Sequence, residues 1–153
     1  MTDLPALRDA VFRPMKVSDL TALAELDELC SPSPWSRPQF QAELGKTFSR
    51  FQVLDLPSFP AAGFGGFWMV RGEAQLVNLV VHPRFQGQGW GRRILRGLLK
   101  TALSLGGQRA ALEVREHNAP ARALYQSEGF VETSRRPYFY EGKETAVLME
   151  KYI

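Results

Sequence analysis

Residues 73–107 read EAQLVNLVVHPRFQGQGWGRRILRGLLKTALSLGG. The first nine residues are mostly apolar and rich in valine and leucine, which predicts a strand, and the His-Pro pair that follows ends it. Apolar residues then recur at helical spacing from Ile94 to Leu103, and Gly106-Gly107 ends the helix. The stretch therefore predicts a strand, a glycine-rich loop and a helix, in that order.

The glycine-rich loop is suited to hold a phosphate group. The first N–H groups of a helix lack partners within the helix, and the helix dipole adds partial positive charge there. Gly87, Gly89 and Gly91 permit a tight loop and a close approach of the backbone to an anion, and Arg92 and Arg93 add charge. A structural glycine turn before a helix is the simpler alternative.

Spacing narrows the kind of phosphate ligand. A nucleotide-hydrolase P-loop and a dinucleotide fingerprint would each require a glycine where Arg92 stands, and no Lys-Ser/Thr pair follows. The remaining pattern is Gln-x-x-Gly-x-Gly, from Gln86 to Gly91. In this position it resembles the coenzyme A loop of the GNAT superfamily of N-acetyltransferases.

The rest of the chain predicts further alternating elements. Ser18 is expected to cap a helix through Leu26, and Ser36 with Gln39 forms a capping box for a second helix over residues 37–44. Asn118 opens a third helix, which Gly129 ends. Strands are expected over residues 10–15, 51–56, 63–70, 73–81, 109–116, 130–136 and 144–153.

Glycines mark two further features of the expected strands. Gly72-Glu73 is the expected turn between residues 63–70 and 73–81, which we interpret as part of an antiparallel meander. Gly63, Gly65 and Gly66 weaken an ordinary strand, so we expect a bulge or a bend at them.

A second resemblance lies in residues 112–130, LEVREHNAPARALYQSEGF. This stretch is similar to the bacterial ribosomal-protein-alanine N-acetyltransferases, whose pattern is Leu-Glu-Val-Arg, two residues, Asn, then Leu-Tyr and Gly-Phe. Pro34-Trp35-Ser36, residues 73–83 and the RRPYFY of residues 135–140 also resemble that family. The resemblance extends from Phe12 to the end. It implies an α/β (α+β) acyl-CoA N-acyltransferase fold, with a twisted, mostly antiparallel sheet flanked by helices, in one domain of residues 1–153.

The resemblance also implies the chemistry. Glu113 matches the general base of the family and Tyr125 its general acid, which protonates the departing thiolate. Glu113 lies among apolar residues of its expected strand, where desolvation would make it a better base. The alternatives are an edge carboxylate paired with Arg115 or Arg109, and a core tyrosine whose hydroxyl is already bonded.

Further residues are implied to hold the acetyl donor, acetyl-CoA, and the acceptor. Asn118 is both a helix cap and an implied donor contact. The implied donor-binding residues are Leu79, Val80, Val81, Gln86, Gly87, Gln88, Gly89, Trp90, Gly91, Arg92 and Asn118. On the acceptor side we expect Trp35, Glu73, Tyr138 and Tyr140, each of which is otherwise a packing residue.

The acceptor implied by the resemblance is the N-terminal alanine of a ribosomal protein. Glu144-Thr145 stands where the family has an acidic pair, and Pro137 and Phe139 interrupt the basic-aromatic segment, which weakens that implication. A small amine, a polyamine, an antibiotic or a lysine side chain is therefore a rival acceptor. A non-catalytic acyl-CoA-binding module and a nucleic-acid-binding domain are rival functions.

Composition limits the remaining possibilities. The 153 residues are 44% apolar and 23% charged, which is typical of a packed globular domain, and no apolar run approaches the roughly 20 residues of a membrane span. The N-terminus lacks the pattern of an export signal, and Cys30 is a single cysteine, so we expect a cytoplasmic protein without disulfides. We expect no metal, no membrane and no direct nucleic-acid partner, since the net charge of +3 is mild.

Overall fold

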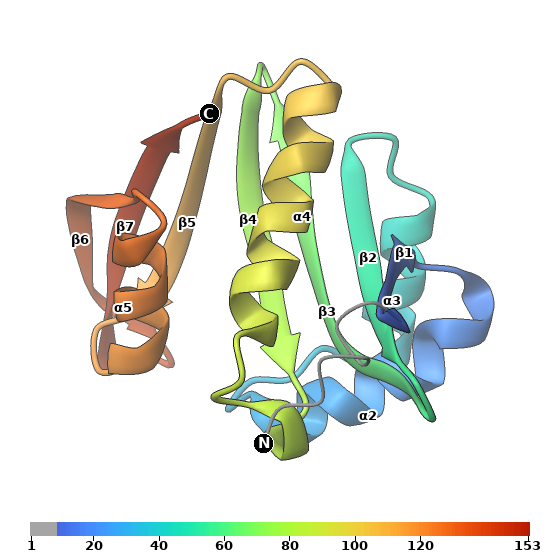
Figure 1. Cartoon of the computed structure of the whole chain (residues 1–153). Coiled ribbons are helices and arrows are strands. Elements are labelled where there is room, and N and C mark those ends of the chain that lie inside the picture. Colours follow the sequence, from blue (N-terminus) through green and yellow to red (C-terminus); the bar gives the residue numbers. More distant parts are fainter. Residues whose placement is uncertain (1–8) are drawn as a thin grey trace. The chain divides into compact units, whose positions relative to one another are not determined.

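The computed structural model describes residues 9–153, and within them the chain forms a seven-stranded mixed sheet with helices (Figure 1). The strands, in sheet order, are β1 (Val11–Pro14), β2 (Ser49–Leu56), β3 (Phe59–Val70), β4 (Glu73–Val81), β5 (Arg109–Arg115), β7 (Glu144–Tyr152) and β6 (Val131–Tyr140). The helices are α2 (Leu20–Cys30), α3 (Arg37–Leu44), α4 (Trp90–Ser104) and α5 (Ala119–Ser127). Strand β4 pairs with β5 in parallel, whereas β1/β2, β2/β3, β5/β7 and β6/β7 are antiparallel. The predicted mixed α/β fold is confirmed.

The chain divides into two compact units. Among the described residues, the first unit comprises residues 9–68 and 77–98, and the second comprises residues 69–76 and 99–153. Strands β3 and β4 and helix α4 contribute residues to both units. A single domain of residues 1–153 therefore stays a prediction.

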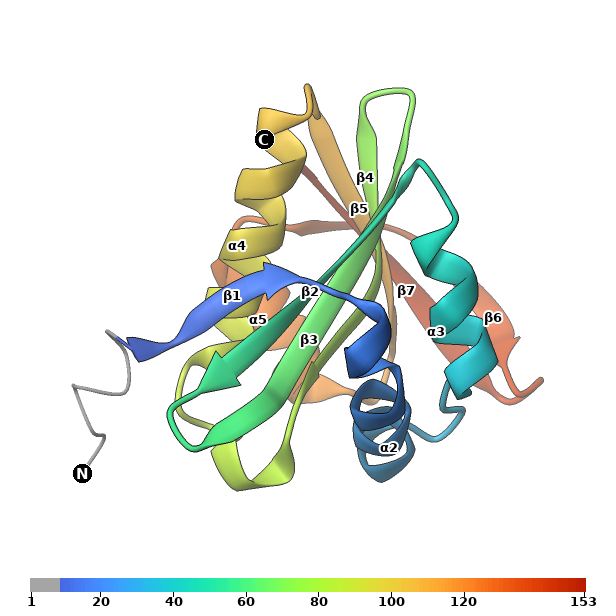
Figure 2. The ribbon, with the colours of Figure 1, turned by 90° about the vertical axis from the view of Figure 1, so that its right-hand side faces the viewer.

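Helices α2 and α3 of the first unit cover one face of its strands (Figure 2). Leu20 and Leu23 of α2 and Phe40 of α3 are fully buried against Phe64 of β3. The rings of Phe40 and Phe64 meet edge to face with centroids 5.4 Å apart, an arrangement that aromatic pairs favour. Apolar burial on this face therefore fixes the two helices on the strands.

The two predicted helix starts in this unit had different outcomes. Ser36 and Gln39 form the expected reciprocal capping box at α3. The predicted cap at Ser18 is wrong, because Ser18 lies inside a 3-10 turn, Val17–Asp19, that precedes α2. The carboxylate of Asp19 accepts the Lys16 N–H and pairs with Arg13, so Asp19 organises the turn in place of Ser18.

The glycines of β3 provide space for close packing, and the expected irregularity borders Gly63 alone. The pairing of β2 with β3 is regular from Gly63 to Gly66 and shifts just beyond Gly63, between the pairs Leu54–Gly63 and Leu56–Phe59. A Cβ on Gly63 would lie 2.8 Å from the backbone oxygen of Val80 and 2.9 Å from Ile94 of α4. Such contacts explain why residues without side chains occupy this strand.

Replacing Gly63 with alanine should therefore destabilise the fold. A methyl group cannot be placed there without moving the backbone of β4, so we expect the free energy of unfolding to fall by about 1–3 kcal/mol. Urea denaturation followed by circular dichroism would measure this. Gly45→Ala is the control, because the nearest atom to its Cβ is 3.7 Å away, and a loss as large as that of Gly63→Ala would refute the packing explanation.

The second unit is built on β5, β7 and β6, with α5 between β5 and β6 in the sequence (Figure 1). Asn118 caps α5 as predicted, with its side-chain oxygen accepting the Ala121 N–H at 3.3 Å, and Gly129 follows the helix at φ +93°. The turn before β4 is Arg71-Gly72 at positive φ, whereas Glu73 begins the strand, which corrects the expected Gly72-Glu73 turn.

Strand β6 is longer than predicted and is exposed along nearly its whole length. Its pairing with β7 is irregular between Arg136 and Tyr140, where Tyr138 adopts φ +58°. Because a bulge redirects the side chains that follow it, this irregularity sets where the aromatic residues of β6 point.

None of the helices in residues 9–153 combines the length and apolar character needed to cross a bilayer.

Candidate active site

The glycine-rich loop of the first unit leaves backbone donors open. Gly87 and Gly89 adopt φ +74° and +91°, and no atom lies within 4 Å of a Cβ placed on either. Among the described residues, the backbone N–H groups of residues 87–91 find no acceptor. Consecutive unpaired N–H groups at the start of α4 form the kind of cradle that binds a phosphate. The chemistry of this loop therefore fits a pyrophosphate.

The side chains of the loop anchor it to the first unit. Gln86 donates its amide N–H to the backbone oxygen of Val81 at 2.9 Å, which ties the loop to the end of β4. Trp90 is buried, and the guanidinium of Arg93 lies 5.6 Å from the centre of its ring. Gln88 and Arg92 belong to the same loop and are predicted to bind the donor, Gln88 through its backbone and Arg92 through its charge. Gln86 and Trp90 thus position the loop through their side chains.

The end of β4 contains the three residues that the family resemblance assigns to the donor. Val80 and Val81 are buried, and Leu79 is half-buried. The thiol of Cys30 lies 3.6 Å from the backbone oxygen of Val81, and burial, with the charge of Asp27, raises the pKa of this thiol. The side chains are packing residues, so any contact to a donor would come from their backbone.

In the second unit, Glu113 lies on β5 with one oxygen unpaired. Its Oε1 atom is 3.3 Å from Nη1 of Arg136, and 31% of its side chain is accessible. The expected burial among apolar residues is therefore not observed within this unit. The expected alternative pairing with Arg115 or Arg109 is also absent within the described residues, because those arginines bind other carboxylates.

Tyr125 lies on α5 and has a free hydroxyl. Its ring packs edge to face on Phe130, with centroids 5.8 Å apart, and its hydroxyl bonds to no described residue. Burial, and next the charge of Tyr140, raise the pKa of Tyr125 to about 12. The alternative of a core tyrosine with a bonded hydroxyl is thus not supported, and the side chain retains a proton to donate.

Tyr140 connects the two candidate catalytic residues electrostatically. Burial raises the pKa of Tyr140, and the charge of Glu113 raises it further. The guanidinium of Arg115 lies 4.2 Å from the centre of the Tyr140 ring. The charge of Glu113 thus raises the pKa of Tyr140, and Tyr140 raises that of Tyr125, whereas the acceptor-side role of Tyr140 stays a prediction.

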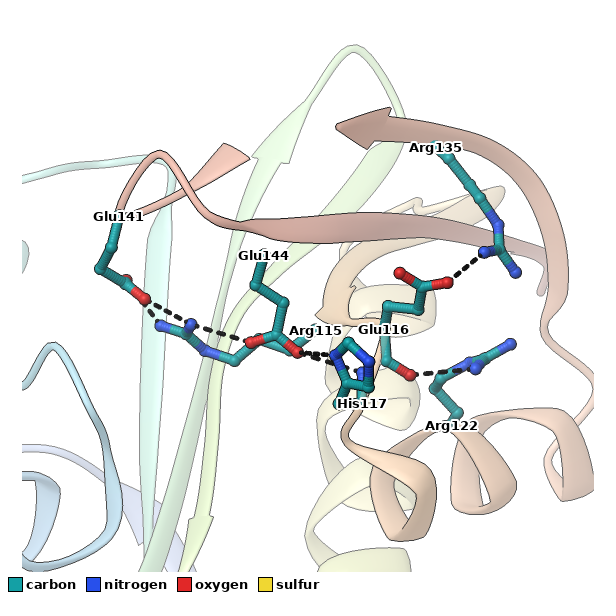
Figure 3. A network of polar contacts seen from close by, with 7 residues as sticks. All are labelled: Arg115, Glu116, His117, Arg122, Arg135, Glu141 and Glu144. Carbon is teal, nitrogen blue, oxygen red and sulfur yellow. Dashed lines mark hydrogen bonds and ion pairs between the residues drawn. The ribbon is translucent and has the colours of Figure 1, made fainter. Parts of the chain in front are cut away.

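A network of ion pairs surrounds the start of α5 (Figure 3). Arg115 binds Glu141 through two hydrogen bonds and Glu144 through one, which raises the pKa of its guanidinium. Glu144 also accepts hydrogen bonds from the backbone N–H of His117 and contacts its ring at 3.0 Å. These contacts join the β6–β7 turn to the end of β5, so the network holds the segment between β5 and α5 in place.

The remaining acceptor-side predictions differ in their placement. Glu73 lies opposite Arg109 and pairs with it at 3.6 Å, four residues along β5 from Glu113, on the order of 13 Å away. Tyr138 is 73% exposed at the β6 irregularity. Trp35 belongs to the first unit, where its ring packs on Phe40. The structure thus leaves Glu73 apart from Glu113.

Arg136 is the residue that the sequence did not single out. It lies in a basic-aromatic segment, and its partner Glu113 is 23 positions earlier in the chain, so no local pattern reveals the pair. The residues that the structure describes contain no cluster of three or more histidine, cysteine or acidic side chains arranged for a metal ion.

Comparison with known proteins agrees with this geometry. The family model for the acetyltransferase (GNAT) family matches residues 20–130. The chain belongs to the GNAT family. The predicted family and fold are confirmed, and as a member of this family the chain is an acetyltransferase.

Similar GNAT proteins include enzymes that act on a ribosomal protein. The [ribosomal protein bS18]-alanine N-acetyltransferase of Escherichia coli K12 is 34% identical over 138 residues, covering 88% of this chain and 92% of the relative. The crystal structure of the E. coli ribosomal-protein-S18-alanine N-acetyltransferase superposes with a TM-score of 0.86 at 31% identity and covers 94% of both chains. Arabidopsis thaliana NAA60 in complex with acetyl-CoA shares the fold, with a TM-score of 0.85 at 20% identity over 94% of this chain and 98% of that one.

Proposed function

We propose that this chain transfers the acetyl group of acetyl-CoA to the N-terminal α-amine of a ribosomal protein that begins with alanine. The similarity to bS18-alanine N-acetyltransferases over nearly the whole chain carries this proposal. The unpaired oxygen of Glu113 and the free hydroxyl of Tyr125 support it, because amine acetylation needs a proton acceptor and a proton donor. Such a protein would work in the cytoplasm as a single domain.

Acetyl-CoA would supply the acetyl group as an activated thioester. The unpaired N–H groups of residues 87–91 and the charge of Arg92 would hold its pyrophosphate, and the backbone of residues 79–81 would hold its pantetheine arm. Asn118 would add a contact through its side-chain amide, since only its oxygen is used in capping α5.

Glu113 and Tyr125 would manage the protons of a direct transfer. Glu113 takes a proton from the acceptor amine, directly or through a water molecule, as the amine nitrogen bonds to the acetyl carbon. Tyr125 donates a hydrogen bond and then its proton to the sulfur as the carbon–sulfur bond breaks. The products are the acetylated amine and a free thiol, and solvent restores both side chains, so no covalent enzyme intermediate is required.

The acceptor side would be formed by the aromatic residues. Tyr140 interacts with both catalytic candidates, and Tyr138 is exposed on the same strand. An α-amine has an ordinary pKa of about 7.7–8.0, against about 10.4 for lysine, so a larger fraction of it is already the free nucleophile at neutral pH. This difference favours a protein N-terminus over a lysine side chain.

A panel of acceptors would test the proposal. We expect the purified protein to release coenzyme A from acetyl-CoA in the presence of a peptide that begins with alanine, and mass spectrometry should locate the acetyl group on its α-amine. The matched controls are the same peptide with a blocked N-terminus and an internal lysine, and spermidine. Faster transfer to either control than to the free α-amine would contradict the proposed acceptor.

A further inference from the structure

Glu113 and Arg136 form an ion pair across an intervening strand. Glu113 of β5 is paired with Leu148 of β7, which is in turn paired with Ser134 of β6. Because alternate residues of a strand share a face, Arg136 lies on the same face as Ser134 and Glu113. Its guanidinium extends over β7 to within 3.3 Å of Glu113. The pair therefore depends on the strand order β5–β7–β6.

The side chain of the neighbouring arginine, Arg135, lies on the opposite face of β6. Arg135 binds Glu116 at 2.7 Å and Glu132 at 2.5 Å. Two consecutive arginines thus have separate partners. Arg135 belongs to a network of several carboxylates and arginines, whereas Arg136 binds a single carboxylate.

Glu113 has fewer charged partners than Glu132 and Glu144 of this unit, whereas Glu116 and Glu150 likewise pair with a single arginine. Glu144 accepts hydrogen bonds from Arg115 and from His117, and both oxygens of Glu132 contact arginine. Among the described residues, Glu113 has Arg136 as its one ion-pair partner, and its Oε2 atom has none. A carboxylate held at one oxygen and open at the other is suited to accept a proton in a fixed direction.

Arg136 is itself held in place. Its backbone is paired with Ala146 at the last regular position before the β6 irregularity, and its guanidinium lies 5.5 Å from the centre of the Phe139 ring. Among the described residues, the other titratable or charged groups on this face include Tyr140 of β6, Arg109 and Arg115 of β5, Glu144, Glu150 and Tyr152 of β7, and Glu73 of β4. Arg115 is engaged by Glu141 and Glu144, so it does not compete for Glu113.

We propose that Arg136 is a positioning residue that holds Oε1 of Glu113 and thereby directs Oε2 toward the acceptor amine. This inference rests on the proposed function, in which Glu113 is the base. Without the guanidinium, the exposed glutamate side chain would sample several rotamers, and fewer of them would allow proton transfer. Arg136 would then affect kcat through Glu113, without touching either substrate.

A double-mutant cycle with the full chain would test this role. We expect Arg136→Gln to lower kcat by about 5- to 10-fold while the KM for acetyl-CoA stays unchanged. Arg136→Lys should retain most of the activity, because an ammonium group can still hold one carboxylate oxygen. In the Glu113→Gln background, Arg136→Gln should change kcat by less than about twofold, since the base it positions is already lost.

Arg135→Gln is the matched control, with the same change of charge on the same strand and on the opposite face. It should leave kcat near that of the unaltered protein. An unchanged kcat in Arg136→Gln, or an equal loss in both Glu113 backgrounds, would overturn the positioning role alone. An unaltered protein that acetylates no amine would overturn the proposed function, and this inference with it.

Discussion

Glu113→Gln is expected to lower kcat for an alanine-starting peptide by roughly 100- to 1,000-fold. Glutamine keeps the size of the side chain and removes its ability to accept a proton. The ion pair with Arg136 is accessible to solvent, so its loss should change the melting temperature little. Steady-state kinetics with purified protein would give kcat, and calorimetric titration should show unchanged affinity for coenzyme A.

The dependence on pH separates a base from a residue that merely binds the acceptor. An α-amine loses its proton with a pKa of about 7.7–8.0, so the need for a base decreases as the pH rises. The defect of Glu113→Gln should therefore be larger at pH 6.5 than at pH 9. Glu150→Gln is the control, because Glu150 lies on the neighbouring strand β7 and binds Arg109. A Glu113→Gln variant with the kcat of the unaltered protein would remove Glu113 from the mechanism.

The loop and the local helix signals were predictable because they depend on residues close in sequence. The capping box of Ser36 and Gln39 spans four residues, and the pattern of the glycine-rich loop spans six residues. Asn118 caps α5 for the same local reason. The prediction of a cap at Ser18 was wrong because Asp19, one position later, forms the ion pair with Arg13 that organises the turn.

Features that depend on distant segments were not predictable in this way. The need for Gly63 comes from the backbone of β4 and from Ile94 of α4, which no local pattern reveals. Strand β6 is exposed on both sides, so its sequence carries no alternation of apolar and polar residues that would define its faces. Without the faces of β6 and the strand order, Arg136 could not be assigned to Glu113.

For the predicted site residues, the sequence identified each residue but not its surroundings. The resemblance assigned Glu113 and Tyr125 from their own motifs, whereas their environments came from the structure. Glu113 is accessible to solvent, although burial was expected. The hydroxyl of Tyr125 has no hydrogen-bond partner among the described residues. Glu73, chosen by the same resemblance as an acceptor-side residue, instead pairs with Arg109 away from Glu113.

The raised pKa of Tyr125 changes how this residue can assist the leaving group. A thiol like that of cysteine has a pKa of about 8.5, well below the value of about 12 that burial and Tyr140 give to Tyr125. Proton transfer from Tyr125 to the thiolate is therefore uphill by about 3.5 pKa units even after the bond to carbon has broken. Tyr125 would stabilise the developing negative charge as a hydrogen-bond donor, and its proton would pass to sulfur as solvent returns a proton to the phenolate.

Tyr125→Phe should consequently lower kcat by about 100-fold and leave the fold intact, because the ring on Phe130 is kept and the lost hydroxyl bonds to no described residue. The raised pKa also fixes the pH dependence. The hydroxyl keeps its proton at neutral pH and loses it only as the pH rises toward about 12. The ratio of kcat between the unaltered protein and Tyr125→Phe should thus stay constant from pH 7 to pH 10. A ratio that narrows by twofold or more by pH 10 would mean that Tyr125 ionises with an ordinary pKa of about 10, and an equal kcat would exclude it as the proton donor.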